Sequence, residues 1–168
     1  MSIGLKYNGA VNKIAENAYS DDLVKAILAQ VPAATKQMSN GAALQFARYT
    51  PKGKICPRKT AEAVWLWLRN NITYKKDEPG AQRLFLPSAF TTLKIGDCKS
   101  FALFTAAVLS SLKIKNGFFF TSYKSFDKPS HVYNYIETVT GKTVPVDGCY
   151  SSFGKMKKPL YIRKIKIL

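Results

Sequence analysis

One cysteine, one histidine and one aspartate stand at positions from which they could together carry out nucleophilic chemistry. Cys98 lies in the stretch KIGDCKSFALF, directly after Gly96 and Asp97 and directly before an apolar run. A cysteine at the start of a helix is a good nucleophile, because unpaired backbone N–H groups and the helix dipole stabilise its thiolate. The same N–H groups could hold the oxyanion that forms when a thiolate attacks an amide carbonyl. Cys98 is therefore a candidate nucleophile.

A cysteine nucleophile needs a base and a group that orients the base. His131, the only histidine of the chain, begins the segment HVYNYIET, and Asp147 ends the next segment, KTVPVDG. If these segments form a hairpin that turns near Thr140 and Gly141, the numbers of paired residues sum to about 280, and those of His131 and Asp147 sum to 278. The two side chains would then be diagonal neighbours on one face. A slip of one residue would place them on opposite faces.

Each of these residues also has an ordinary structural interpretation. A helical cysteine can be part of the packing, a lone histidine can lie at the surface, and an aspartate before a glycine can form a turn. Zinc binding by Cys56, Cys98, Cys149 and His131 is a further alternative, but no two of these residues have the close spacing usual for zinc ligands. No calcium-loop pattern is visible. We expect neither a metal nor another cofactor.

The elements that would position these residues begin with helices in the first part of the chain. SDDLVKAILAQV predicts a helix with Ser20 as its N-cap that ends before Pro32. NGAALQFARYTPKGK predicts a short helix that runs into a loop, and PRKTAEAVWLWLRNNITY predicts a longer helix. In that longer helix the residues at helical spacing are Ala63, Leu66, Trp67 and Asn70. From Cys98 onward, a second set at helical spacing predicts one buried face: Phe101, Phe104, Val108 and Leu112.

The segment before Cys98 and the last third of the chain have different characters. Residues 75–96 contain Pro79, Gly80 and Pro87 and predict a long irregular approach to the cysteine. Beyond Asn116 the chain alternates in hydrophobicity and is rich in aromatic and β-branched residues, which predicts strands. The expected strands are GFFFTSYK, HVYNYIET, KTVPVDG and LYIRKIKIL. Helices followed by an antiparallel sheet indicate the α+β class.

The composition is that of a folded protein with a strongly basic surface. The chain has 168 residues, of which 46% are hydrophobic and 12% aromatic, and this suits one domain with its own core. Lys and Arg number 26 against 10 Asp and Glu, which gives a net charge of +16. Such a charge favours an acidic partner, a nucleic acid or an anionic wall polymer. It can equally serve solubility alone, and no nucleic-acid-binding motif accompanies it.

The sequence also bears on where the protein works. No apolar run approaches the roughly 20 residues that a membrane span needs, and the first residues lack the pattern of a signal peptide. Three cysteines without CxxC spacing favour a reducing compartment over a disulfide scaffold. We therefore expect a cytoplasmic protein without a membrane partner, or one carried in a phage particle that is assembled in a host cytosol.

Several stretches together resemble one known family. GDCKSFALFTAAVLSSLKI, HVYNYIE and VPVDG are similar to the transglutaminase-like superfamily of papain-like cysteine peptidases and acyltransferases, in its bacterial or phage members. The resemblance covers roughly residues 60–150 and includes TAEAVWLWLRNNITYKKD and AQRLFLPSAFTTLKIGDC upstream of the cysteine. The positions that depart from the family pattern are Ile95 in place of a glycine, Ser100 in place of an acidic residue and Val132 in place of a tryptophan.

The resemblance implies a papain-like core in which a central helix carrying the cysteine packs on an antiparallel sheet. It implies Cys98 as nucleophile, His131 as base and Asp147 as orienting acid, with Gln82 in polar contact with the oxyanion or the substrate. We expect a single domain over residues 1–168. Its parts would be a core at about 60–150, a helical N-terminal extension at 1–55 and a basic C-terminal strand at 151–168.

The chemistry of such a site is acyl transfer on amide bonds. Water as acceptor gives a peptidase or amidase, and an amine gives a cross-linking enzyme. Hydrolysis is favoured because neither a calcium loop nor large accessory domains are visible, and the substrate would be a protein or a peptidoglycan stem peptide. One alternative is a non-enzymatic structural or binding module, for example within a phage virion. Another is a nucleic-acid binder without acyl chemistry, whose binding would depend steeply on salt.

Overall fold

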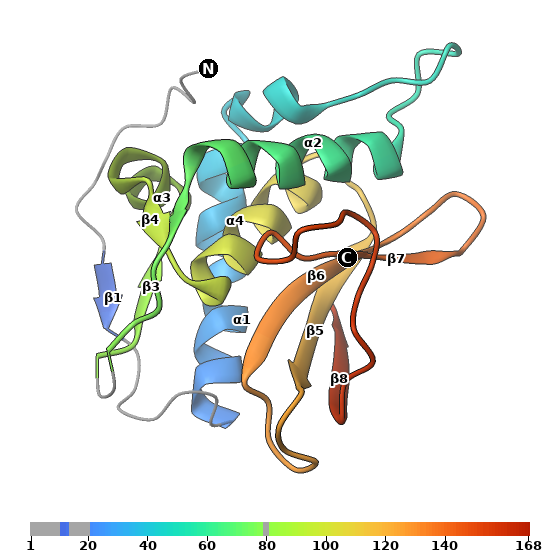
Figure 1. Ribbon diagram of the computed structural model, residues 1–168. Coiled ribbons are helices and arrows are strands. Elements are labelled where there is room, and N and C mark those ends of the chain that lie inside the picture. Colours follow the sequence, from blue (N-terminus) through green and yellow to red (C-terminus); the bar gives the residue numbers. More distant parts are fainter. Residues whose placement is uncertain (1–10, 14–20, 79–80) are drawn as a thin grey trace.

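The centre of the structure is the helix that begins at Cys98, labelled α4 (Cys98–Ser111) in Figure 1. The structure is a computed structural model that describes residues 11–13, 21–78 and 81–168. Every residue of α4 from Cys98 to Ser110 is buried. A helix that is apolar on all sides is stable only when other elements surround it. The sequence predicted one buried face for this helix, and the burial extends to the other faces as well.

The elements around α4 supply its packing partners. Helices α1, α2 and α3 pack against it, and the short helix η1 joins α1 to α2. Their bounds are α1 (Asp21–Met38), η1 (Ala42–Phe46), α2 (Pro57–Asn71) and α3 (Pro87–Leu93). The rings of Trp67 and Phe104 stack at 5.1 Å, and Phe46 meets both rings edge-on. Among the described residues, no helix is long and apolar enough to cross a bilayer.

The first helix continues beyond the point where the sequence predicts its end. α1 runs through Pro32 to Met38, so the predicted end before Pro32 is wrong. Proline removes one backbone hydrogen bond from a helix, but Pro32 is exposed, and the next turns bury Ala34 and Met38 completely. Burial of these side chains against α4 offsets the lost hydrogen bond. The expected N-cap, Ser20, lies outside the described residues.

The second helix is present as predicted, but a different face of it is buried. The residues of α2 in the core are Thr60, Ala61, Val64 and Leu68. Leu66, which belongs to the predicted set, is 51% exposed. Both sets recur at three and four residues, so helical spacing alone does not select the face that meets α4.

The segment between α2 and α4 is ordered into short elements, so the prediction of an irregular approach is wrong. Its elements are β2 (Thr73–Tyr74), β3 (Arg83–Phe85), α3 and β4 (Ile95–Gly96). β2 pairs in parallel with β4, and β3 pairs antiparallel with β1 (Val11–Lys13). These pairings join segments far apart in the chain, and the local pattern does not reveal them. Pro79 and Gly80 lie outside the described residues.

The chain after α4 forms an antiparallel sheet with the strand order β7-β6-β5-β8 among the described residues. The strands are β5 (Asn116–Ser122), β6 (His131–Glu137), β7 (Thr143–Val146) and β8 (Tyr161–Lys166). The predicted α+β class is therefore confirmed. In the hairpin of β6 and β7, Asn134 faces Val146 and Ile136 faces Val144, so the paired numbers sum to 280. The register inferred from the sequence is correct.

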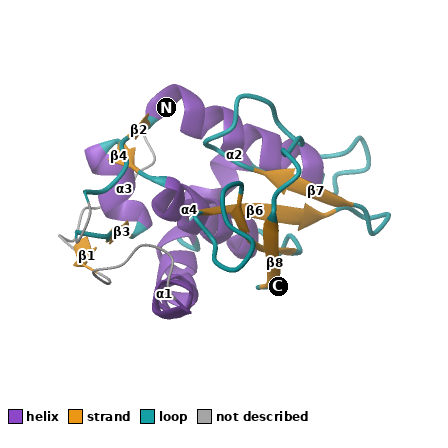
Figure 2. Cartoon of the chain, turned by 60° about the horizontal axis from the view of Figure 1, so that its bottom comes forward, coloured by secondary structure: helices purple, strands orange, loops and turns teal. Residues whose placement is uncertain are grey.

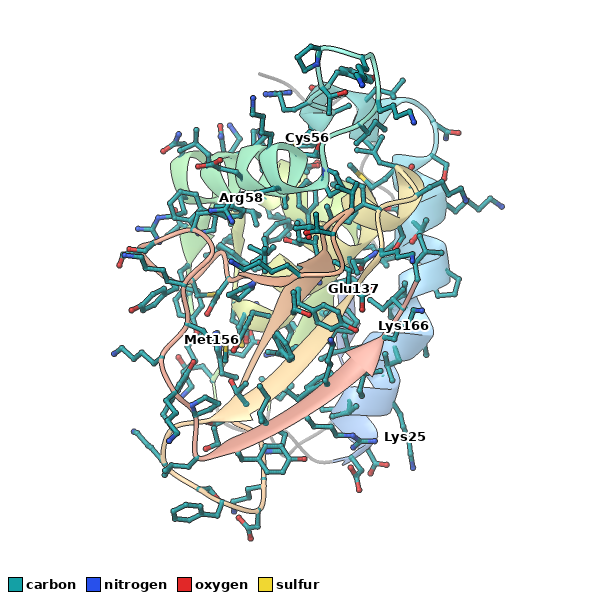
Figure 3. The ribbon with its side chains drawn as sticks, turned by 90° about the vertical axis from the view of Figure 1, so that its right-hand side faces the viewer. Lys25, Cys56, Arg58, Glu137, Met156 and Lys166 are labelled. Atoms are coloured by element: carbon teal, nitrogen blue, oxygen red, sulfur yellow. The ribbon has the colours of Figure 1, made fainter. Side chains whose placement is uncertain are left out.

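The two faces of this sheet have different neighbours (Figure 2). Phe118, Phe120, Val132 and Ile136 pack into the main core with α4, whereas Phe119, Tyr133 and Tyr135 form a second apolar cluster. We call residues 148–160, which lead from β7 to β8, the return segment. Figure 3 shows Met156 of this segment beside the sheet, where its sulfur accepts a hydrogen bond from the Tyr133 hydroxyl at 3.7 Å.

We expect Gly117 of β5 to be irreplaceable, because a Cβ there would overlap the carbonyl oxygen of Ile165 and lie 2.5 Å from the Tyr135 hydroxyl. Gly117→Ala should lower the free energy of unfolding by about 2–3 kcal/mol, measured by urea denaturation. Gly141→Asn is the matched control, since Gly141 has φ 78° with nothing near its Cβ, a conformation that asparagine tolerates. Equal stabilities of the two variants would contradict the close approach of β5 and β8.

Candidate active site

Cys98 is the first residue of α4, as the sequence predicted. Asp97 is the N-cap, and its carboxylate accepts a hydrogen bond from the backbone N–H of Lys99 at 3.1 Å. The cap fixes where the helix starts and so places the sulfur at the positive end of the helix dipole. Cys98 is only 2% exposed, so the site is a buried one.

Gly96 explains why the chain can approach this helix so closely. A Cβ at Gly96 would lie 2.8 Å from a ring carbon of Phe90 and 3.1 Å from the Cβ of Ser100. Any larger residue would push β4 away from α3 and from the first turn of α4. The glycine ahead of Asp97 and Cys98 therefore has a packing role that sets the position of the cap.

The hairpin of β6 and β7 brings His131 and Asp147 together. His131 is the first residue of β6, and Asp147 directly follows β7. The imidazole Nε2 lies 2.7 Å from Oδ2 of Asp147, and Oδ1 of the same carboxylate accepts the backbone N–H of Cys149 at 2.9 Å. Both carboxylate oxygens are thus engaged, and the orientation of the acid is fixed.

The imidazole also interacts with Cys98. Burial of the ring lowers the pKa of His131, but hydrogen bonds with Asp147 and Cys98, together with the negative charges of these groups, raise it from 6.5 to about 10. The ring is therefore a cation at neutral pH. Because Nε2 faces Asp147, Nδ1 is the nitrogen left to face the sulfur. The structure brings Cys98, His131 and Asp147 to one place.

A tryptophan of α2 holds the end of β7. The indole N–H of Trp65 donates to the backbone carbonyls of Asp147 at 3.0 Å and of Tyr150 at 3.2 Å. The Arg69 guanidinium lies over the Trp65 ring and donates to the Tyr150 carbonyl. Trp65 therefore ties the acid and the return segment to α2. The sequence analysis missed this role, because an indole on an amphipathic helix does not reveal its hydrogen-bond partner.

Gln82 lies against the first turn of α4, where it accepts a hydrogen bond from Lys99, a residue that was not among the predicted site residues. Lys99 is completely buried, and its ammonium donates to Oε1 of Gln82 at 2.8 Å. The same ammonium forms ion pairs with Asp97 and, at 3.3 Å, with Asp77. A lysine inside an otherwise apolar helix is a signal that could have been noticed, since buried ammonium groups need acidic partners.

Two further ionisable groups border the site. Burial raises the pKa of Tyr74, and so does the negative charge of Cys98. Burial, followed by the charges of Cys98 and Asp147, likewise raises the pKa of the Cys149 thiol, which keeps it protonated at neutral pH. Tyr74 is 49% exposed and therefore lies at the solvent side of the site.

The zinc alternative finds no support in the positions of its residues. In the part of the chain that the structure describes, no group of three or more His, Cys, Asp or Glu side chains could hold a metal ion. Cys56 lies at the N-cap of α2 (Figure 3), whereas Cys98 and His131 meet at the amino end of α4.

Comparisons with known proteins identify the family of the chain and support its fold. The family model of the transglutaminase-like domain matches residues 49–141, which include Cys98 and His131. No curated protein matches the sequence. Because the model covers more than half of the chain, the protein belongs to the transglutaminase-like domain family.

Solved structures are similar at low identity. A candidate protease of Parabacteroides distasonis is 13% identical over 77% of this chain and 26% of its own, with a TM-score of 0.52. A TGase is 14% identical over 84% of this chain and 36% of its own, with a TM-score of 0.45. A candidate cysteine protease of Cytophaga hutchinsonii is 20% identical over 53% of this chain and 30% of its own, with a TM-score of 0.38. This chain thus spans between 26% and 36% of their lengths. Of these three, the Parabacteroides distasonis structure supports the fold.

The raised pKa of His131 predicts how stability depends on pH. The protonated ring is favoured in the folded state, so its contribution is complete below pH 6.5 and is lost as pH rises toward 10. We expect the free energy of unfolding of the wild type to fall by on the order of 3 kcal/mol more than that of His131→Gln between pH 6.5 and 10. Urea unfolding of both proteins at several pH values measures this. Parallel curves would show that the ring has no preferred charge.

Proposed function

We propose that this transglutaminase-like protein carries out acyl transfer on amide bonds, with Cys98 as nucleophile, His131 as acid and base, and Asp147 as the group that orients the imidazole. One observation carries the proposal. The imidazole bonds to Asp147 at 2.7 Å and also meets Cys98 at the amino end of α4. A structural domain has no need for a buried imidazolium placed between a thiol and a carboxylate, because unpaired burial of these groups is costly.

The reaction follows from these positions. The Cys98 thiolate attacks the amide carbonyl, a C–S bond forms, and the carbonyl oxygen becomes an oxyanion. We assign the amino end of α4 and the amide N–H groups of Gln82 as its stabilising groups. As the C–N bond breaks, His131 gives its proton to the leaving amine. His131 then takes a proton from water, whose oxygen attacks the thioester, and the carboxylic acid leaves as the C–S bond breaks.

Hydrolysis is the outcome we propose, with a protein or a peptidoglycan stem peptide as substrate. An amine in place of water would give transamidation through the same thioester. The net charge of +16 favours an acidic substrate. Basic residues of the return segment and β8 are exposed and could meet it: Lys155, Lys157, Lys158, Arg163, Lys164 and Lys166. The cytoplasm stays our proposal for the location.

Substrate must reach a sulfur that is almost fully buried. The imidazole of His131 is 17% exposed, which is more than the 10% of the Asp147 side chain, and Tyr74 stands half exposed nearby. We therefore propose that the scissile amide approaches from the side of His131 and Tyr74.

Iodoacetamide labelling at pH 6 tests the nucleophile. We expect Cys98 to react at least about tenfold faster than Cys56 and Cys149, because the imidazolium beside it stabilises the thiolate. His131→Ala should remove most of this preference. Asp147→Asn should reduce it less, since the ring would lose its orientation but keep its place. Mass spectrometry of the labelled peptides measures all three rates.

The controls separate the remaining interpretations. Cys149→Ser should leave the rate at Cys98 unchanged, because the Cys149 thiol is held protonated. Slow and equal labelling of all three cysteines would contradict the enzyme and favour a structural or binding module. Incorporation of a fluorescent amine into casein as acyl donor, rather than release of peptide fragments from it, would replace hydrolysis by transamidation.

A further inference from the structure

The feature that the proposed reaction leaves unexplained is a fully buried ammonium next to the nucleophile. Lys99 follows Cys98 directly and is 0% exposed. Removing an ammonium from water costs several kcal/mol unless acceptors replace the water. A leucine or methionine would fill the same space in an apolar helix at no such cost. The acceptors around Lys99 therefore indicate what its charge does.

Three acceptors from three segments meet the Lys99 ammonium. They are the carboxylate of Asp97 from the N-cap, the carboxylate of Asp77 at 3.3 Å, and Oε1 of Gln82 at 2.8 Å. Asp77 also pairs with the half-exposed guanidinium of Arg83 at 3.0 Å. The two carboxylates balance the charges. The amide of Gln82 is neutral and adds no charge balance; it supplies the third acceptor that the ammonium needs.

The chemistry of lysine decides which way the Gln82 amide faces. An ammonium can only donate hydrogen bonds, so the amide atom turned toward Lys99 must be the oxygen. The two N–H groups therefore form the opposite end. A second contact keeps this segment in place, because the backbone N–H of Phe85 donates to Oγ of Ser100 at 3.1 Å. Residues 82–85 are thus held along the first turn of α4 at two points.

We propose that Lys99 is a positioning residue for acyl transfer, and that it acts by holding the oxygen of the Gln82 amide so that the N–H groups face the oxyanion formed at Cys98. This inference rests on the proposed function. Without the ammonium, the amide could rotate by half a turn and present its oxygen to the oxyanion, which would repel it. The buried charge therefore selects the productive orientation of Gln82.

Two reactions of the same thiol distinguish positioning from support of the fold. Alkylation by iodoacetamide displaces iodide from carbon and forms no oxyanion. Acylation by p-nitrophenyl acetate forms a C–S bond and an oxyanion, after which the C–O bond breaks and p-nitrophenolate leaves. A residue that acts through the oxyanion affects the second reaction and spares the first.

The experiment compares both rates at Cys98 in the wild type and four variants. We expect Lys99→Met to slow the p-nitrophenolate burst by at least about tenfold while the alkylation rate stays within about twofold of the wild type. Gln82→Ala should behave in the same way, and Lys99→Met combined with Gln82→Ala should be no slower than Gln82→Ala alone, because Lys99 acts through Gln82. Lys76→Met, which removes an exposed lysine next to Asp77, is the matched control and should keep both rates.

Each of the other outcomes contradicts either the proposed function or the proposed role of Lys99. A wild type without a burst at Cys98 would overturn the proposed function and this inference with it. A wild-type burst that Lys99→Met leaves unchanged would overturn the inference alone. Equal slowing of both reactions, or additive effects in the double variant, would assign Lys99 to the fold. If Lys99→Met fails to fold, the double variant Lys99→Met with Asp77→Asn takes its place, because it also removes a carboxylate that Lys99 no longer neutralises. Its burst rate and its alkylation rate are then compared in the same way.

Discussion

The structure depends on one constraint, which is that the amino end of α4 lies inside the protein. A helix terminus leaves backbone N–H groups without partners, and burial makes that costly. Here Asp97 caps the first turn, and its own charge is balanced by Lys99. Because Gly96 has no Cβ, β4 can lie close to the ring of Phe90 and to Ser100 in the first turn of α4. Cys98 is thus placed, with little freedom, at the positive end of the helix dipole and beside the His131 imidazole.

The charges around this terminus form a small, dense network. The carboxylates are those of Asp77, Asp97 and Asp147, and the opposing cations are Lys99, the His131 imidazolium and the half-exposed Arg83. Adding a thiolate makes the balance more negative. Burial first, and then this negative charge, raises the pKa of Tyr74 and of the Cys149 thiol. The imidazolium lies between the Asp147 carboxylate and Cys98, and both groups favour its charged form.

The sequence was sufficient where the determinants are local. The strands of the sheet, the start of α4 and the register of the β6–β7 hairpin follow from alternation, a cap and a short turn, and these led to His131 and Asp147. Pairings between distant segments, such as β1 with β3, carry no local signal. The face of α2 was ambiguous because two sets of residues have the same spacing. The continuation of α1 past Pro32 depends on burial of Met38, which only the assembled core determines. Lys99 was missed because its partners come from two other segments.

The position two residues after the cysteine shows how such a network constrains its members. An acidic residue there, as in many members of the family, would add a third carboxylate near Asp97 and Asp77, with a single buried lysine to balance all of them. Ser100 instead accepts the backbone N–H of Phe85 without adding charge. Lys99 pairs with Asp97 at the N-cap and with Asp77 on a separate segment, and Arg83 also pairs with Asp77. Ser100, Lys99 and Asp77 therefore act together. The neutral hydroxyl of Ser100 holds β3 at Phe85, and the Lys99 ammonium, which pairs with Asp77, holds the amide of Gln82.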